Sequence, residues 1–96
     1  MDGEWEVLIL ESAEREVDRL REDVRGEAMD AIADLSEDPF PPGHLRMRGY
    51  NDCYRIRIGG DAYRIVYRVD RKNRVVKVFR VRPRATAYRG MRNPTD

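Results

Sequence analysis

Arginines alternate with apolar residues along residues 54–69, and arginine is the side chain best suited to hold a phosphate group. Its planar guanidinium stays charged at physiological pH and binds two oxygens of a phosphate or carboxylate at once. The four arginines of this stretch are Arg55, Arg57, Arg64 and Arg68. The two runs in which the alternation is regular, 54–58 and 63–69, contain no carboxylate. We therefore expect an anion-binding surface, and the alternative is a basic surface without a binding role.

Groups that could accept a proton are scarce near these arginines. A guanidinium, with a pKa above about 12, is a very poor base. The only histidine, His44, lies beside a proline-rich stretch and is expected to be structural. Among the few carboxylates of the second half, Asp61 falls in a turn and Asp52 at the start of a strand. Cys53 is the only cysteine, so we expect no intrachain disulfide, no metal site and no cofactor.

The alternation itself predicts a β-hairpin, because successive side chains of a strand point to opposite faces of the sheet. Two runs of alternating residues, 54–58 and 63–69, flank a turn at residues 59–61. One face of this hairpin carries the arginines, with Val66 between Arg64 and Arg68. The other face is apolar and carries Tyr54, Ile56, Ile58, Tyr63, Ile65, Tyr67 and Val69.

The remaining elements follow in order along the chain. Residues 5–10 predict a short buried strand, and a helix is expected from about residue 12 with Ser12 as its N-cap. Its apolar pattern extends to about residue 36 as one bent helix, or as two antiparallel helices separated near Arg21–Asp23 and Gly26. In the second case Asp23 would cap the second helix. A stiff proline-rich linker at 37–43, a third strand at 74–81 and a short basic segment at 82–89 complete the chain.

This order of elements predicts an α+β fold. The hairpin and third strand would form an antiparallel meander that completes a four-stranded sheet with the N-terminal strand. The helices would cover the apolar face and leave the arginine face free. With 96 residues, we expect a single domain spanning 1–96.

Charge divides the chain into two halves of opposite sign. Residues 1–45 hold four basic and fourteen acidic side chains, a net charge of −10, whereas residues 46–96 hold fifteen and four, a net charge of +11. The basic half favours a polyanionic partner. The acidic N-terminus and the short apolar run at 7–10 predict neither secretion nor membrane insertion, and the lone cysteine fits a reducing cytoplasm.

Three segments together resemble the RelE/ParE toxin family of bacterial toxin–antitoxin modules, and its RelE branch in particular. They are residues 45–58 (LRMRGYNDCYRIRI), 63–69 (YRIVYRV) and 81–89 (VRPRATAYR). The YRIVY motif after a YRIR strand carries most of the resemblance, which extends in order and spacing over nearly the whole chain. Two departures are the arginines at positions where the family often has lysine, and Arg82-Pro83 in place of a common Gly-His.

The resemblance implies a cytoplasmic toxin that inhibits translation by cleaving mRNA on the ribosome without a metal and is held inactive by a cognate antitoxin. It implies a catalytic set of Arg55, Arg57, Arg64, Arg84 and Tyr88. We expect neighbouring RNA contacts from Arg68, Arg82 and Arg89. Two alternatives stay open: a ParE-like inhibitor of DNA gyrase, and a non-catalytic RNA-binding domain.

Overall fold

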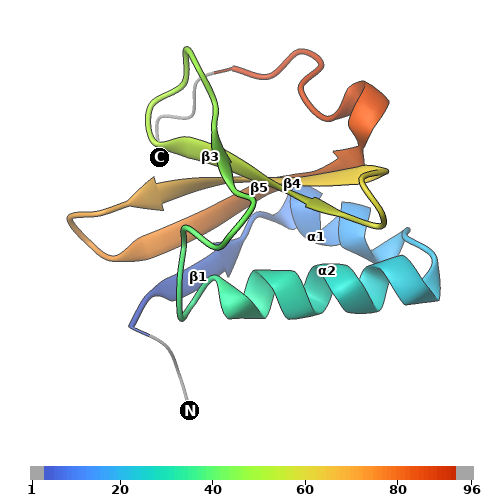
Figure 1. The fold of residues 1–96 in the computed structure, drawn as a ribbon, viewed down its shortest axis with the longest axis horizontal. Coiled ribbons are helices and arrows are strands. Elements are labelled where there is room, and N and C mark those ends of the chain that lie inside the picture. The colour runs from blue at the N-terminus through green and yellow to red at the C-terminus, as the bar shows by residue number, and fades with distance from the viewer. Residues whose placement is uncertain (1–3, 93–96) are drawn as a thin grey trace.

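A sheet with two helices on one face and the C-terminal segment on the other forms the structure, a computed structural model that describes residues 4–92 (Figure 1). The elements in chain order are β1 (Glu6–Ile9), α1 (Glu11–Asp18), α2 (Glu22–Asp34), β2 (Leu45–Arg46), β3 (Cys53–Ile58), β4 (Tyr63–Asp70), β5 (Val75–Pro83) and the 3-10 turn η1 (Arg84–Thr86). The α+β class predicted from the sequence is confirmed. Among these residues, no helix is long and apolar enough to cross a membrane.

The sheet of the described residues has five strands in the order β1-β5-β4-β3-β2. The predicted meander is confirmed, because β3, β4 and β5 pair antiparallel in sequence. The predicted four strands were one too few, since β2 adds a two-residue ladder beside β3. The sheet is also mixed, because β1 runs parallel to β5. A two-residue strand is too short for alternation to reveal it, which explains why β2 was missed.

Two separate helices are present, as in the second of the two predicted arrangements. The chain leaves α1 at Arg19 and enters α2 after Arg21, so Gly26 lies inside the second helix and does not break it. Both predicted caps were wrong. Leu10 and Arg21 occupy the N-cap positions without a side-chain hydrogen bond, and Asp23 lies in the first turn of α2. A carboxylate there still interacts favourably with the helix dipole.

The apolar face of the hairpin forms the core, as predicted. Its side chains pack against buried residues of both helices, among them Val17, Val24 and Ile32. Tyr67 is fully buried and donates a hydrogen bond of 2.7 Å to the carbonyl oxygen of Pro39, which ties the proline-rich linker to the sheet. His44 Nδ1 lies 2.8 Å from the Pro41 carbonyl oxygen in the same linker, which fits the structural role expected for it.

Candidate functional site

Cross-strand pairing sets the arginines of the other sheet face in two rows. Arg57, Arg64 and Arg82 are register partners across β3, β4 and β5. The next row holds Arg55, Val66 and Arg80. The register shifts between Val66 and Tyr67, where one residue of β5 has no partner on β4. We call the face that carries these rows the arginine face.

Strand β5 departs from the sequence-based expectations in two respects, the facing of Arg80 and the place of Arg82. A bulged residue reverses the alternation of side chains beyond it, and it thereby brings Arg80 and Arg82 to the same face as Arg64. Arg82 lies within β5, not in a basic segment that has left the sheet. Arg80 was not predicted as a site residue, because the simple period of two cannot register a bulge.

The arginine face is not free, contrary to expectation. Arg55 is 8% exposed and Arg64 is 6% exposed. Residues 84–92, which follow β5 and which we call the covering segment, pass over this face on the side of the sheet opposite the helices (Figure 1). The covering segment is held there by hydrogen bonds from Arg80 Nη1 to the carbonyl oxygen of Ala87 (3.1 Å) and from Tyr50 Oη to that of Met91 (3.1 Å). Two of the arginines that the sequence placed in solvent are thus buried in the structure.

Three of the five predicted catalytic residues meet at one carboxylate, Asp61. Arg57 Nε and Arg64 Nη1 each lie 3.1 Å from Asp61 Oδ1, and Arg84 Nη1 lies 3.4 Å from Oδ2. These arginines come from β3, β4 and the start of η1, so Asp61 forms ion pairs with three separate parts of the chain. Asp61 reaches them with a backbone φ of 78°, a left-handed conformation that aspartate tolerates better than most residues. We call this group the Asp61 cluster.

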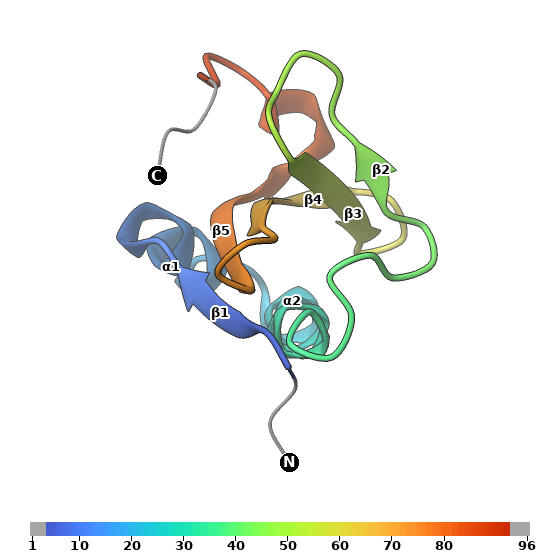
Figure 2. The same ribbon diagram turned by 90° about the vertical axis from the view of Figure 1, so that its left-hand side faces the viewer.

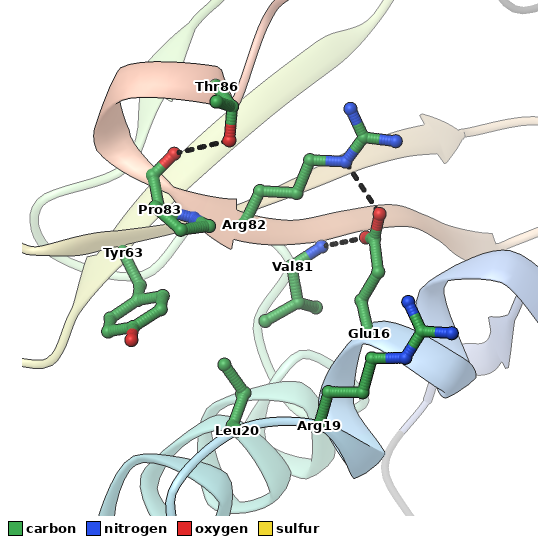
Figure 3. Close-up of a pocket in the computed structure, with 8 residues that line it drawn as sticks. All are labelled: Glu16, Arg19, Leu20, Tyr63, Val81, Arg82, Pro83 and Thr86. Atoms are coloured by element: carbon green, nitrogen blue, oxygen red, sulfur yellow. Dashed lines mark hydrogen bonds and ion pairs between the residues drawn. The ribbon is translucent and has the colours of Figure 1, made fainter.

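Arg82 points away from this cluster toward the first helix. Its Nε lies 2.6 Å from Glu16 Oε2, while Glu16 Oε1 accepts a hydrogen bond of 2.9 Å from the Val81 N–H. Figure 3 shows both contacts at the rim of a pocket of about 370 Å³ lined also by Leu20 and Tyr63. Glu16 thus satisfies a backbone donor at the edge of β5 and engages an arginine that the sequence assigned to RNA binding.

Arg55 and Tyr88, the other two predicted catalytic residues, line a common groove of about 470 Å³. The rest of its lining comes from β2 and the turn that follows: Leu45, Arg46, Met47, Arg48 and Tyr50. These residues were not predicted as site residues. Arg46 and Arg48 nevertheless alternate with apolar residues before a glycine, which is the pattern that marked the arginines of the hairpin. In the view of Figure 2, β2 lies beside β3 at one edge of the sheet. An aromatic ring and several cations around one groove suit a nucleobase with its phosphate.

The remaining predicted RNA contacts lie outside the Asp61 cluster. Arg68 is half-buried and lies in the row of Cys53 and Lys77, farther along the strands from Asp61. Arg89 is exposed on the covering segment. The structure therefore divides the eight predicted residues into the Asp61 cluster, the groove and three separate positions.

The buried thiol of Cys53 is not an available nucleophile. Burial is the main cause that raises its pKa to about 11, and the neighbouring Arg68 offsets this only in part. The thiol is therefore protonated at neutral pH, and its residue is fully buried. Chemistry on this face has to come from the arginines and from the groups that they bind.

Comparison with known proteins matches both the fold and the motifs. The model of the family described as the ParE toxin of the type II toxin–antitoxin system parDE matches residues 7–88. The structure of the E. coli RelBE toxin–antitoxin complex matches with 29% identity over 82% of this chain and 95% of the other, at a TM-score of 0.72. No curated protein sequence matches the chain.

Two further solved structures extend the comparison. The RelBE2 toxin–antitoxin complex of Mycobacterium tuberculosis is 26% identical over 83% of this chain and 98% of the other, with a TM-score of 0.70. A toxin of Agrobacterium tumefaciens described as YoeB/ParE shares the fold at 20% identity, covering 81% of this chain and 96% of the other, with a TM-score of 0.69. The family model and the folds agree with the motifs of β3, β4 and η1, and the chain therefore belongs to the RelE/ParE superfamily of toxins of type II toxin–antitoxin systems.

Proposed function

We propose that this toxin is a ribosome-dependent endoribonuclease that inhibits translation by cleaving mRNA. The observation that carries the proposal is the convergence of Arg57, Arg64 and Arg84 on one anionic group. Such a cluster suits a phosphate, which is also an anion with oxygens in several directions. The likeness to E. coli RelE at 29% identity supports the same choice within the superfamily.

The proposed reaction needs no covalent enzyme intermediate. The 2′-oxygen of a ribose loses its proton and bonds to the adjacent phosphorus, while the bond from phosphorus to the 5′-oxygen breaks and that oxygen gains a proton. The products are a 2′,3′-cyclic phosphate and a 5′-hydroxyl. Negative charge builds up on the phosphorus oxygens in the transition state, and positioned guanidiniums stabilise it.

The exposure of the three arginines indicates how RNA would reach the cluster. The side chains of Arg57 and Arg84 are 55% and 68% exposed, whereas that of Arg64 is 8% exposed. The two exposed guanidiniums are free to turn toward a phosphate. Arg64 also donates to the carbonyl oxygen of Asp61 at 2.9 Å, so it stays fixed and holds the turn in place. We assign phosphate binding to Arg57 and Arg84 and orientation of the cluster to Arg64.

A strong proton acceptor is not evident among the described residues of this face. Asp61 is the carboxylate in contact with the proposed phosphate-binding arginines, and three guanidiniums already engage its oxygens. Tyr88, at the groove with Arg55, is the proposed group for stacking on a base. Weak acid–base groups make the reaction depend on how precisely the RNA is placed, which is why we assign a role to the ribosome.

Gyrase inhibition is the second candidate, and two observations favour it. The matching family model is described by the ParE toxin, and Asp61 neutralises part of the charge that RNA would meet. In this case the protein would bind another protein and carry out no reaction. The antitoxin is a proposed partner in both cases, because the E. coli and M. tuberculosis structures are toxin–antitoxin complexes.

Cleavage of one mRNA in programmed ribosomes and free in solution tests the proposal. We expect new 5′ ends on ribosome-bound mRNA and far fewer on the free transcript. Replacing the exposed pair Arg57 and Arg84 by Ala should abolish cleavage without unfolding. Arg15→Ala is the matched control, because Arg15 is an exposed arginine of α1 whose ion pair is with Glu11 of the same helix. Equal cleavage of free mRNA would refute the ribosome dependence, and loss of supercoiling by gyrase with translation intact would favour the second candidate.

A further inference from the structure

Arg80 holds the chain on both sides of Tyr88. Its Nη1 donates to the carbonyl oxygen of Ala87 at 3.1 Å and to that of Arg89 at 2.8 Å. Tyr88 is the residue between these two acceptors, and its side chain lines the groove with Arg55. Arg80 and Arg55 lie in one cross-strand row with Val66 between them. A guanidinium that lies under the covering segment thus links the sheet to the residue proposed to contact RNA.

The segment has little other structure to hold Tyr88 in place. After η1 ends at Thr86, the backbone hydrogen bonds of the described residues 87–92 are those of tight turns, from Arg89 N to Thr86 O (3.2 Å) and from Met91 N to Tyr88 O (3.3 Å). Ala87 is fully buried and anchors the start of this segment. Tyr50 binds the carbonyl oxygen of Met91 farther along. Arg80 is the contact that spans Tyr88 itself.

Placing an arginine here costs free energy, because its charged guanidinium is partly removed from water. Burial lowers the pKa of Arg80, and the neighbouring Arg82 lowers it further. A guanidinium offers five N–H groups in a fixed plane and can bridge two carbonyl oxygens, which a shorter or uncharged side chain cannot do equally well. Hydrogen bonds from a charged donor are also stronger than those between neutral groups.

We propose that Arg80 is a positioning residue that fixes Tyr88 in the groove by bridging the carbonyl groups on either side of it. This inference rests on the proposed function in one respect, namely that Tyr88 contacts the RNA. Arg80 itself acts through Tyr88. Its guanidinium binds the main chain of the covering segment, so RNA cleavage should sense its loss through the position of the ring.

Hydrogen exchange tests the positioning without any activity. In Arg80→Met, which keeps a long side chain but has no donor, the amides of residues 84–92 should exchange faster than in the wild type. Arg80→Lys should give an intermediate rate, because an ammonium has donors for both carbonyl oxygens but is not held in the fixed plane of a guanidinium. The amides of β3 and β4 should stay protected in both variants and report an intact fold. Unchanged exchange at 84–92 in Arg80→Met would overturn the inference, whether or not the protein cleaves RNA.

A double-mutant cycle on ribosome-bound mRNA tests the link to Tyr88. Arg80→Met should lower kcat on the order of 10-fold to 100-fold, the scale on which a misplaced group affects catalysis, with KM for ribosomes nearly unchanged. Arg80→Lys should recover part of this loss. In the Tyr88→Ala background, Arg80→Met should cost little more, because the ring that it positions is gone. Losses that multiply would show that Arg80 acts independently of Tyr88 and would overturn the inference. A wild-type protein that does not cleave mRNA would refute the proposed function and leave the hydrogen-exchange result to decide the role of Arg80.

Discussion

At the scale of single residues, burial separates arginines that look alike in the sequence. Arg57 and Arg64 are register partners on neighbouring strands, and both bind Asp61. Arg57 is more than half exposed, whereas Arg64 is almost fully buried. Arg64 also donates to the main-chain oxygens of Asp61 and Tyr63. A buried guanidinium needs these partners, since an unpaired buried charge is strongly destabilising. The same residue type therefore serves structure in one strand and phosphate binding in the other.

Arg64→Ala should consequently affect both stability and cleavage. Asp61 keeps two other arginines, so we expect a loss of about 1–3 kcal/mol in the free energy of unfolding and not complete unfolding. Cleavage of ribosome-bound mRNA should fall on the order of 10-fold to 100-fold, because the turn that places Arg57 and Arg84 loses a support. Urea unfolding and single-turnover cleavage below the unfolding transition measure the two effects. Arg64→Lys should recover part of each. Near-normal cleavage by a folded Arg64→Ala protein would show that Arg64 does not orient the Asp61 cluster for cleavage.

The stability of the fold should fall in alkaline solution because of Cys53. Its pKa is raised mainly by burial to about 11, so the folded state keeps the proton at a pH where the unfolded thiol has lost it. The contribution is complete below the unfolded pKa of about 9 and is lost as the pH rises toward 11. Burial also raises the pKa of Tyr67, which adds a loss in the same direction.

Unfolding experiments from pH 8 to pH 11 check this prediction. Replacing Cys53 with Ala removes the thiol, so the variant should lose less stability over this range than the wild type does. Tyr67→Phe is the complementary variant, since it also gives up the hydrogen bond to Pro39 and should lose about 1 kcal/mol at neutral pH. Equal pH dependence in wild type and Cys53→Ala would contradict the assignment to the thiol.

At the scale of elements, the β3–β4 turn places Asp61 and so assembles the site. Gly59, Gly60 and Asp61 all have positive φ, which carries the chain around a tight turn. The amide of Gly59 donates to Glu27 Oε1 of α2, so the turn is also attached to the helical layer. The position of Asp61 therefore depends on backbone conformations that glycine adopts most easily.

Substitutions at the two glycines should differ in cost. A Cβ on Gly59 would lie 3.0 Å from Tyr63 Cδ1, whereas a Cβ on Gly60 would meet nothing within 4 Å. Both alanines carry the left-handed backbone cost of about 1–2 kcal/mol. Gly59→Ala should therefore be the less stable of the two by thermal unfolding, and it should also lose more cleavage because Tyr63 adjoins Arg64. A greater loss in Gly60→Ala would mean that the backbone and not the contact with Tyr63 limits the turn.

Regular periodicity explains which elements the sequence could predict. The hairpin has a clean period of two, so its strands, turn and two faces followed from residue types alone. The break between the helices was one of two predicted alternatives, and its caps were not predicted correctly because both N-cap residues have side chains that make no cap. The bulge in β5 and the covering of the arginine face depend on contacts between distant parts of the chain. Local patterns do not record such contacts, and so Arg80, Glu16 and the role of Asp61 escaped prediction.

At the scale of the whole molecule, the two charged halves of the chain become two sides of the fold. The helices, which come from the acidic half, cover one face of the sheet (Figure 1). The arginine rows set by the strand register lie on the other face. The contacts between Glu16 and Arg82 and between Glu27 and the turn join the two sides. The acidic side should limit indiscriminate binding to nucleic acid, while the basic side should attract an anionic partner and steer it toward the arginine face.

The proposed antitoxin complex should depend on this charge separation. With a net charge of +11 in residues 46–96, we expect the antitoxin to bring acidic residues toward the arginine face. Raising the salt from about 0.1 M to about 1 M shortens the screening length from about 10 Å to about 3 Å, so association should slow markedly while dissociation changes less. Surface plasmon resonance with the cognate antitoxin measures both rates. Replacing Arg57 and Arg84 with Ala should reduce the salt dependence, whereas Arg15→Ala on the helical side should not. An association rate that is unaffected by salt in the wild type would mean that apolar contacts, and not the arginine face, guide the antitoxin to the toxin.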